Sequence, residues 1–241
     1  MLLTRIPVNW QKISPDTPPD LNRCLWVYPI VGIIVSLIGA VIYLGAQVLN
    51  IPQMASILLC LSAMIITTGA FHEDGLADTM DGFGGGVSPE KKLDIMRDSR
   101  IGTYGGLALI LSIGIKVTSL SVLSLNHVVF ALLVGATVSR LMIIFALMIL
   151  LPARKKSLSV EAGKPSIKSV IVATTITILV CLSLQDIVTI IYILSAAIVT
   201  TAIFCRLAYN QVAGYSGDIL GSIQQISEIS VYLTLCAIWS I

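Results

Sequence analysis

The sequence contains few charged residues for its length. Of its 241 residues only 12% are Asp, Glu, Lys or Arg, while 56% are hydrophobic and the mean hydropathy is +0.94. Soluble globular domains carry about 25% charged residues, so this composition excludes an ordinary soluble domain and indicates an integral membrane protein. The formal net charge of +2 gives no reason to expect a nucleic-acid partner, and we expect none.

The sequence also lacks paired cysteine motifs, low-complexity segments and an internal repeat of fixed period. Its five cysteines are scattered in or beside apolar segments, so we expect packing residues and no disulfide framework. The opening residues MLLTRIPVNWQK contain too short an apolar run for a cleaved signal peptide. The cysteines are Cys24, Cys60, Cys181, Cys205 and Cys236.

Long apolar runs occupy most of the chain. A helix needs about 20 apolar residues to cross a hydrocarbon core about 30 Å thick. Six runs meet this length, and a seventh is weaker because Gln224, Gln225 and Glu228 interrupt it. We therefore predict an all-α polytopic membrane protein, a single domain over 1–241 with six to seven transmembrane helices and a short cytoplasmic or interfacial helix. The expected spans are 24–49, 52–71, 105–124, 128–151, 167–184 and 187–205, with 219–241 as the weaker one.

Positive charges fall on alternate connections between these spans. The N-terminal segment and every second connection together hold thirteen Lys and Arg residues, and the connections between them hold none. This positive-inside bias predicts that the N-terminus and the charged loops lie in the cytoplasm, on the inner side of the cytoplasmic membrane. The residues are Arg5, Lys12, Arg23, Lys91, Lys92, Arg97, Arg100, Arg154, Lys155, Lys156, Lys164, Lys168 and Arg206.

The stretch FHEDGLADTMDGFGGG, residues 71–86, places several carboxylates at the end of an apolar run. If the second helix continues to about residue 81, Asp74, Asp78 and Asp81 lie on one face and rise about 10 Å along it. Glu73 points about a quarter turn away, as a ligand reached from the side or as a neighbour that supports one. Oxygen ligands without cysteine suit Mg²⁺ or Mn²⁺ rather than zinc, so the spacing predicts a metal site. The alternative is a solvated acidic helix end paired with nearby lysines.

His72 and the glycines flank these acids. A histidine at a membrane interface can be an amphipathic edge residue, or it can orient a ligand or move a proton, and the sequence leaves these alternatives open. The glycine run that includes Gly84 and Gly85 is expected to end the helix and to let the backbone approach a bulky anion. No Lys-Ser or Lys-Thr follows at the spacing of a P-loop.

The next segment, SPEKKLDIMRDSRIGTYG, predicts a new helix with Ser88 as its N-cap, which Gly102 then ends. Glu90, Asp94 and Asp98 recur every four residues on one face of such a helix. One interpretation is an amphipathic helix on the membrane surface, with its basic residues near lipid phosphates. The other lets Asp98 complete the metal site. In that interpretation Arg97 and Arg100 contact a substrate phosphate.

Two cations lie inside expected spans, Lys116 in the third and Arg140 in the fourth. An ionisable residue at the centre of a transmembrane helix costs at least about 2.5 kcal/mol, so it normally has a partner that faces the bundle interior. Each of these cations either forms a buried structural ion pair or binds a phosphate in a polar cavity. Near the C-terminus, Asp218 and Glu228 belong to a polar stretch that lines the same cavity or marks a loosely inserted last helix.

These features together suggest metal-dependent phosphoryl transfer. They resemble the CDP-alcohol phosphotransferases in part, because Asp74-Gly75-Leu76-Ala77 matches the core of that family's D-x-x-D-G-x-x-A-R motif only when shifted. The chain is more similar to the cobalamin synthase family, also called adenosylcobinamide-GDP ribazoletransferase. The similarity covers the chain in order through TRIP (4–7), HEDGLADTMDGFGGG (72–86), IMRDSRIGTYG (95–105), SR (139–140) and SGDILG (216–221).

This resemblance implies that a ribosyl hydroxyl of α-ribazole, or of its 5′-phosphate, attacks the cobinamide-side phosphate of adenosylcobinamide-GDP and that GMP leaves. It implies Asp74 and Asp78 as the Mg²⁺ ligands, with Glu73 and Asp81 next. One carboxylate of the cluster, for example Asp81 or Asp98, would accept the hydroxyl proton, and the sequence does not decide which. Asp218 departs from the family pattern, which reads GDT-x-G-A at this point. The candidate phosphate contacts are Arg97, Arg100 and Arg140, beside Lys116, Asp218 and the glycines Gly84 and Gly85.

Three alternatives stay open at this stage. A phospholipid synthase would use a CDP-linked donor, and a cation-coupled transporter would bind its ion near the membrane midplane on broken helices. A protein with only a structural role would not need three acids aligned on one face of a helix. The bilayer is the expected surrounding, and self-association and contact with other enzymes of the corrinoid pathway are open expectations.

Overall fold

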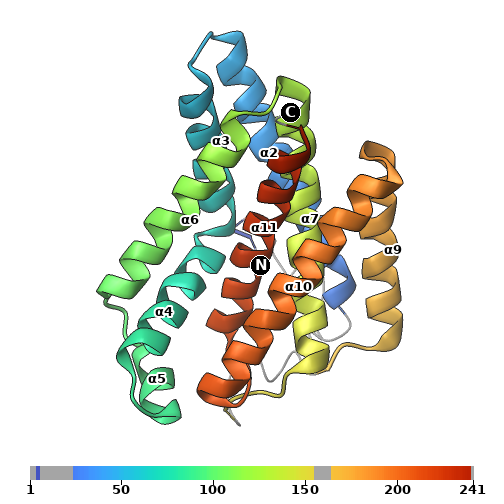
Figure 1. Cartoon of the computed structure of the whole chain (residues 1–241). Helices are drawn as coiled ribbons and strands as arrows, with labels where there is room; N and C mark the ends of the chain where they lie inside the picture. The colour runs from blue at the N-terminus through green and yellow to red at the C-terminus, as the bar shows by residue number, and fades with distance from the viewer. Residues whose placement is uncertain (1–3, 6–23, 155–163, 240–241) are drawn as a thin grey trace, which may run out of the picture.

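The computed structural model describes residues 4–5, 24–154 and 164–239, and within these ranges the protein is all-α, as predicted (Figure 1). The Ile6–Pro7 half of TRIP and the loop charges Lys12, Arg23, Lys155 and Lys156 lie outside the described residues. The elements are η1 (Leu25–Val27), α2 (Tyr28–Val48), α3 (Gln53–Thr68), α4 (Phe71–Gly85), α5 (Pro89–Ile95), α6 (Thr103–Ser121), α7 (Leu125–Ile149), α9 (Ile167–Leu184), α10 (Ile187–Val212) and α11 (Gly217–Trp239).

Five segments of the described chain are long and apolar enough to cross a membrane, namely η1 with α2, and then α6, α7, α9 and α10. The pair α3 and α4 adds a sixth if it is taken as one broken span. Most of α7 is buried, since it packs against α2, α9, α10 and α11. Many large apolar side chains on α2, α9 and α10 are exposed, as expected for surfaces that face lipid.

The second predicted span is broken, so the expectation that one helix continues past Phe71 is wrong. Gly69 and Ala70 both adopt left-handed backbone, with φ of 69° and 59°, and α4 leaves α3 at an angle of 88°. A left-handed residue closes a helix because its N–H turns back to a carbonyl of the last turn. The backbone N–H of Arg5 donates to the carbonyl of Thr67 at 2.8 Å, which ties the N-terminal segment to this break.

The glycine run ends α4 at Gly85, as predicted, and the Ser88 hydroxyl caps α5 by accepting a hydrogen bond from the Lys91 N–H. However, α5 ends at Ile95 and does not reach Gly102, which instead caps the start of α6. The Asp98 carboxylate accepts the Arg100 N–H at 3.1 Å, a local side-chain bond that competes with helix. Asp98 therefore does not share a helical face with Glu90 and Asp94.

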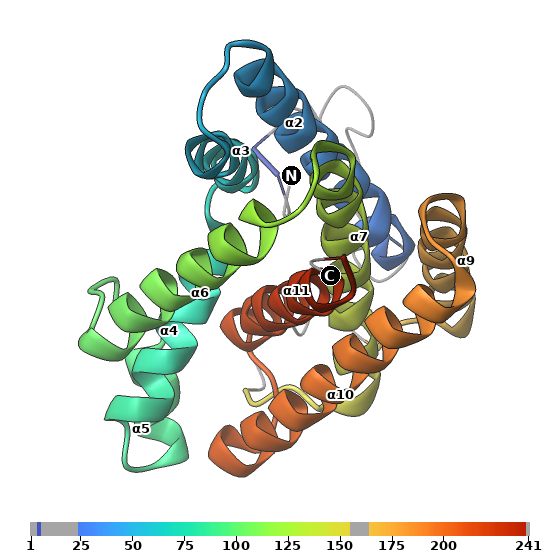
Figure 2. The same cartoon turned by 45° about the horizontal axis from the view of Figure 1, so that its top comes forward.

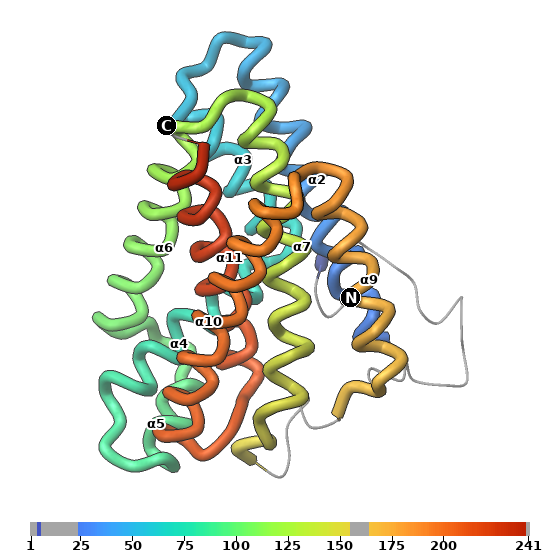
Figure 3. Tube along the Cα trace, turned by 45° about the vertical axis from the view of Figure 1, so that its right-hand side comes forward, coloured from blue at the N-terminus to red at the C-terminus, as the bar shows by residue number. Residues whose placement is uncertain are grey.

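The connections between helices gather at two ends of the bundle (Figure 3). At one end, Arg154 donates to Asp94 at 2.8 Å, Lys92 donates to Gln211, and the Ala153 N–H donates to the Tyr215 carbonyl. These contacts join the segment around α5, the segment after α7 and the turn before α11. At the other end, Gln53 donates to the Leu123 carbonyl at 2.6 Å and joins the two uncharged turns.

The last helix is polar but central. Figure 2 shows α11 in the middle of the bundle, with α4 and α6 on one side and α7 and α10 on the other, and it contacts all four helices. Near its C-terminal end the Trp239 ring stacks on His127 at the start of α7, with ring centroids 4.1 Å apart. The alternative of a loosely inserted last helix is therefore wrong, and the polar side chains of α11 face protein.

Candidate functional site

Asp74 and Asp78 meet Asp218 where α4 packs on α11. The two helices approach closely, since a Cβ on Gly75 would lie 2.8 Å from the Asp218 carbonyl oxygen, and Ser222 donates to the Gly75 carbonyl at 3.0 Å. Asp74 is exposed, while Asp78 and Asp218 are half-buried. Electrostatic repulsion from Asp74 and Asp218 acts on the Asp78 carboxylate. We refer to Asp74, Asp78 and Asp218 as the acidic trio.

The start of α11 orients Asp218. The Ser216 hydroxyl donates to Asp218 Oδ2 at 3.2 Å and accepts the Ile219 N–H at 3.2 Å. The positive charge of Arg97 acts on this carboxylate, and Arg97 itself is exposed. The trio is therefore a concentration of negative charge at the charged end of the bundle, with an exposed arginine nearby.

The donor chemistry of the trio fits a hard divalent cation. Within the described residues no three His, Cys, Asp or Glu side chains lie close enough to hold one metal ion by themselves. Mg²⁺, however, is commonly bound by one or two carboxylates together with waters and substrate phosphates, rather than by a cage of protein ligands. Carboxylates that repel one another on facing helices are suited to such a shared site.

Asp81 is one turn further along α4 and has a different environment. It is buried, and its two oxygens accept the backbone N–H groups of Gly102 at 2.6 Å and Gly105 at 2.9 Å. These groups belong to the N-terminus of α6, where the helix dipole favours a negative charge. A Cβ on Gly105 would lie 2.4 Å from Asp81 Oδ2, so this contact requires glycine. Asp81 therefore anchors α6 to α4.

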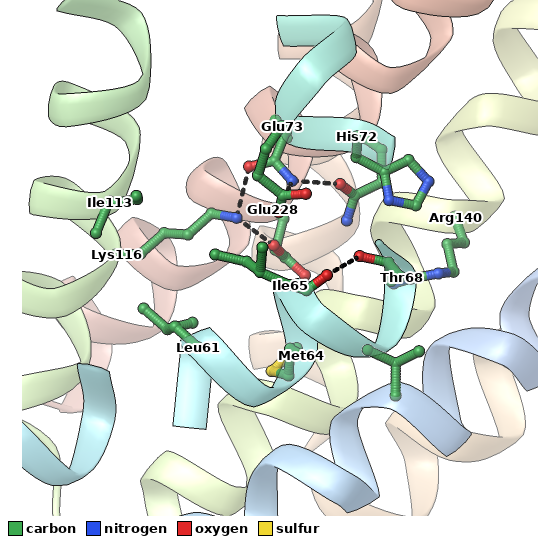
Figure 4. Close-up of a pocket in the computed structure, with 13 residues that line it drawn as sticks. Leu61, Met64, Ile65, Thr68, His72, Glu73, Ile113, Lys116, Arg140 and Glu228 are labelled. Atoms are coloured by element: carbon green, nitrogen blue, oxygen red, sulfur yellow. Dashed lines mark hydrogen bonds and ion pairs between the residues drawn. The ribbon is translucent and has the colours of Figure 1, made fainter. Parts of the chain in front are cut away.

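Glu73 faces the interior of the bundle, away from the acidic trio. Its Oε1 accepts a hydrogen bond from Gln225 at 2.9 Å. The Lys116 ammonium group donates to Gln225 at 2.8 Å and forms a buried ion pair with Glu228 at 2.5 Å (Figure 4). The geometry thus supplies the acid partner for Lys116 that its depth in the membrane requires.

Arg140 is 2% exposed, and its guanidinium donates to the carbonyl of Ala136 at 3.0 Å. Next to it in sequence, the Ser139 hydroxyl accepts a hydrogen bond from Gln224 at 3.0 Å, which links α7 to α11. His72 is also buried and lies beside Arg140 in the same pocket. Arg140 and His72 therefore line the same interior pocket as Glu73, Lys116 and Glu228, and they do not belong to the acidic trio.

Asp98 and Arg100 form an exposed pair. Hydrogen bonds from the Arg100 side chain and N–H lower the pKa of Asp98 to about 2, and the shortest contact, from Arg100 Nη2, is 2.6 Å. A carboxylate with so low a pKa is a weak proton acceptor. Asp98 is held by Arg100 in the segment between α5 and α6, outside the two helices that carry the acidic trio.

The glycines Gly84 and Gly85 at the end of α4 lie near residues of the following segments. A Cβ on Gly84 would lie 2.5 Å from the Tyr104 ring. Gly85 is exposed, and its nearest neighbour for a Cβ is Ile95 at 3.5 Å. Both glycines are exposed, but Gly84 packs closely against Tyr104, whereas Gly85 has room for a side chain.

Sequence reasoning gave Asp218 no place among the metal ligands and assigned no partner to Gln225. The pairing of Asp218 with α4 has a weak signal in the sequence, the small residues Gly75 and Gly221 that let two helices approach. The signal for Gln225 is its polarity inside an apolar run. Neither signal identifies the facing helix.

The chain is similar to known proteins over nearly its whole length. The family model described as cobalamin-5-phosphate synthase matches residues 1–236. The adenosylcobinamide-GDP ribazoletransferase of Bradyrhizobium diazoefficiens is 39% identical over 240 residues, which covers 98% of this chain and 90% of that protein. The proteins of the same name from Azorhizobium caulinodans and Shewanella amazonensis are each 36% identical, over 94% and 98% of this chain and 89% and 92% of their own lengths. No solved structure matches the chain.

Proposed function

Because the chain belongs to the cobalamin-5-phosphate synthase family, we propose that the acidic trio is the site at which it performs the transfer of that family. The enzyme joins adenosylcobinamide-GDP to α-ribazole or its 5′-phosphate in the final assembly step of cobalamin biosynthesis. A ribosyl hydroxyl attacks the cobinamide-side phosphate, and GMP leaves. Family membership replaces the alternatives of a phospholipid synthase, a transporter and a scaffold.

The observation that carries this assignment is the meeting of Asp74 and Asp78 on α4 with Asp218 on α11. A diphosphate approaching these carboxylates would be repelled unless a cation lay between them. We infer that one or two carboxylates of the acidic trio, together with water and the substrate diphosphate, hold Mg²⁺, or Mn²⁺ in its place. When bound, such an ion neutralises the diphosphate charge and activates the attacking hydroxyl.

The surrounding residues have supporting roles in this proposal. Arg97 and Arg100 are exposed at the same end of the bundle and contact phosphate oxygens. Asp98 is a weak base because of its arginine partner, and both oxygens of Asp81 are occupied by backbone N–H groups. The proton of the attacking hydroxyl therefore goes to a carboxylate of the acidic trio. We assign the buried Lys116 and Arg140 to support of α4 rather than to phosphate.

We further propose that the acidic trio faces the cytoplasm from the inner membrane. The segments that carry the positive charges meet at the same end of the bundle as α5, and positive loops remain on the cytoplasmic side. Both nucleotide substrates would be supplied there. Self-association and contact with other enzymes of the corrinoid pathway stay predictions.

The test of the metal site is GMP release by the purified protein in lipid nanodiscs. Adenosylcobinamide-GDP, ribazole 5′-phosphate and Mg²⁺ are supplied, and EDTA is added in a parallel reaction. We expect release that depends on the ribazole compound, disappears with EDTA and returns with excess Mg²⁺. Release that EDTA leaves unchanged would remove the metal from the proposal.

The acidic trio is tested by Asp78→Asn and Asp218→Asn, each of which removes one negative charge and keeps the size of the side chain. We expect kcat to fall at least 100-fold in each variant, because charge stabilisation in the transition state is lost. Glu90→Gln is the matched control, an exposed acid at the start of α5, and should retain the rate of the unchanged protein. Near-normal turnover by both Asp variants would refute the assignment.

A further inference from the structure

A small polar cavity lies inside the bundle, behind the acidic face of α4. Its polar wall is formed by His72 and Glu73 from α4, Lys116 from α6, Arg140 from α7, and Gln225 and Glu228 from α11. In Figure 4 these side chains converge from several helices, and the apolar side chains of Leu61, Met64 and Ile65 close the wall on the α3 side. The cavity therefore touches the residue directly before Asp74.

Charge and size decide what this cavity can contain. Two positive groups, Lys116 and Arg140, are balanced by two negative groups, Glu73 and Glu228, so no further ion is needed for neutrality. The cavity volume is about 30 Å³ counted as space for the centres of water molecules. A single water requires about 10–15 Å³ on this measure, so the space suits about two waters, and the balanced charges of its wall give no net attraction for a phosphate.

Three buried polar atoms on the wall have no hydrogen-bond partner within the protein. They are Nε2 of His72, Oε2 of Glu73 and Nε of Arg140. A buried polar group without a partner costs the free energy of its lost hydration. The Arg140 N–H is a donor and the Glu73 oxygen is an acceptor, so each can bond to water in the cavity that both residues line.

We propose that this cavity holds ordered water that joins His72 and Glu73 of α4 to Arg140 of α7, and that the hydrated cluster positions α4 and its acidic trio. The Gln225 side chain already links Glu73 to Lys116, and the water adds the link from α4 to α7. Because α4 follows the break at Gly69 and Ala70, it needs such lateral contacts to keep its orientation. The positioning part of this inference depends on the proposed function, whereas the presence of water does not.

The water is tested by radiolytic footprinting, in which a short X-ray pulse generates hydroxyl radicals from water bound beside a side chain. Met64 lines the cavity and is 7% exposed, whereas Met142 is buried in α7 and does not line it. We expect Met64 to be oxidised at least five times faster than Met142 in the folded protein. Equal and slow oxidation of both would overturn the inference.

The positioning role is tested by filling the cavity. Val35 is an apolar residue of its wall, and Val134 is an equally buried valine of α7 outside it, so Val35→Ile and Val134→Ile add the same methyl group in the two settings. We expect Val35→Ile to slow Met64 oxidation and to lower kcat at least five-fold, with KM for adenosylcobinamide-GDP unchanged. Val134→Ile should change neither.

The outcomes separate this inference from the proposed function. Fast oxidation of Met64 in a protein that releases no GMP would keep the water and refute the function. GMP release by a protein in which Met64 is oxidised as slowly as Met142 would support the proposed function and refute the presence of water in the cavity. Slower Met64 oxidation in Val35→Ile with kcat unchanged would refute the positioning role.

Discussion

Neighbouring acids on α4 have different partners, and these partners define what each acid can do. Glu73 accepts a hydrogen bond from Gln225 in the interior, Asp74 is exposed as a member of the acidic trio, and Asp81 is held by the backbone of α6. Counting carboxylates along the helix correctly placed Asp74 and Asp78 on one face. It could not assign Asp81 its backbone donors, since these come from Gly102 and Gly105 on another helix.

The buried pair of Lys116 and Glu228 gives a prediction at this scale. Lys116→Met leaves Glu228 buried without its cation and should destabilise the protein by about 3–5 kcal/mol. Adding Glu228→Gln removes the unpaired charge and should recover part of the loss. Unfolding of the detergent-solubilised protein, followed by circular dichroism in increasing SDS, measures both effects. Lys168→Met changes an exposed lysine of α9 and is the control. An equally small shift for Lys116→Met and Lys168→Met would contradict a paired role.

At the scale of elements, the ends of two helices, α3 and α5, determine where the acidic side chains lie. The left-handed pair Gly69 and Ala70 turns α4 by 88° away from α3 and sends its acids along α11. Ala70 carries no signal for a left-handed conformation, so the sequence pattern favoured one continuous helix. The early end of α5 was missed for a related reason, because helical spacing of acids outweighed the local bond between Asp98 and Arg100.

The contact between α4 and α11 gives a prediction for Gly75. In Gly75→Ala the new methyl would lie 2.8 Å from the Asp218 carbonyl oxygen, so the helices must separate by a few tenths of an ångström. We expect GMP release to fall at least ten-fold, since small displacements of reacting groups have large effects on rate. Gly114→Ala in α6 places its methyl in open space and should leave activity unchanged. Equal activity in the two variants would show that the close approach is not needed for catalysis.

At the scale of the whole molecule, the connections sort into a charged end and an uncharged end. The charged end carries α5, the segment after α7 and the turn before α11, and the acidic trio lies beside it. Alternation of apolar spans and positive loops predicted this sorting. The position of α11 in the middle of the bundle did not follow from the pattern, because its polar residues resemble a poorly inserted helix until their partners on α4, α6 and α7 are known.

Orientation is tested by introducing one cysteine at a time into a Cys24→Ser, Cys236→Ser background, in which the remaining native cysteines are buried, and labelling it with a maleimide that does not cross membranes. Ser99→Cys lies in the exposed segment after α5, and Asn126→Cys lies at the uncharged end. We expect Asn126→Cys to be labelled in intact cells and Ser99→Cys only in inverted vesicles. The reverse pattern would place the acidic trio on the outer side of the membrane.

The sequence by itself determined the membrane class, the helical architecture, the separation of charged and uncharged connections, and the placement of Asp74 and Asp78 on one face of a helix. These properties depend on the length of apolar runs and on spacing within one segment, which local physical rules describe. Only the tertiary structure decided which groups those acids meet. The Ser222 hydroxyl donates a hydrogen bond to the carbonyl of Gly75, although the two residues are 147 positions apart in the sequence. This contact brings Asp218 to α4. Such a pairing depends on a backbone break and on helix packing, and neither leaves a periodic signal in the chain.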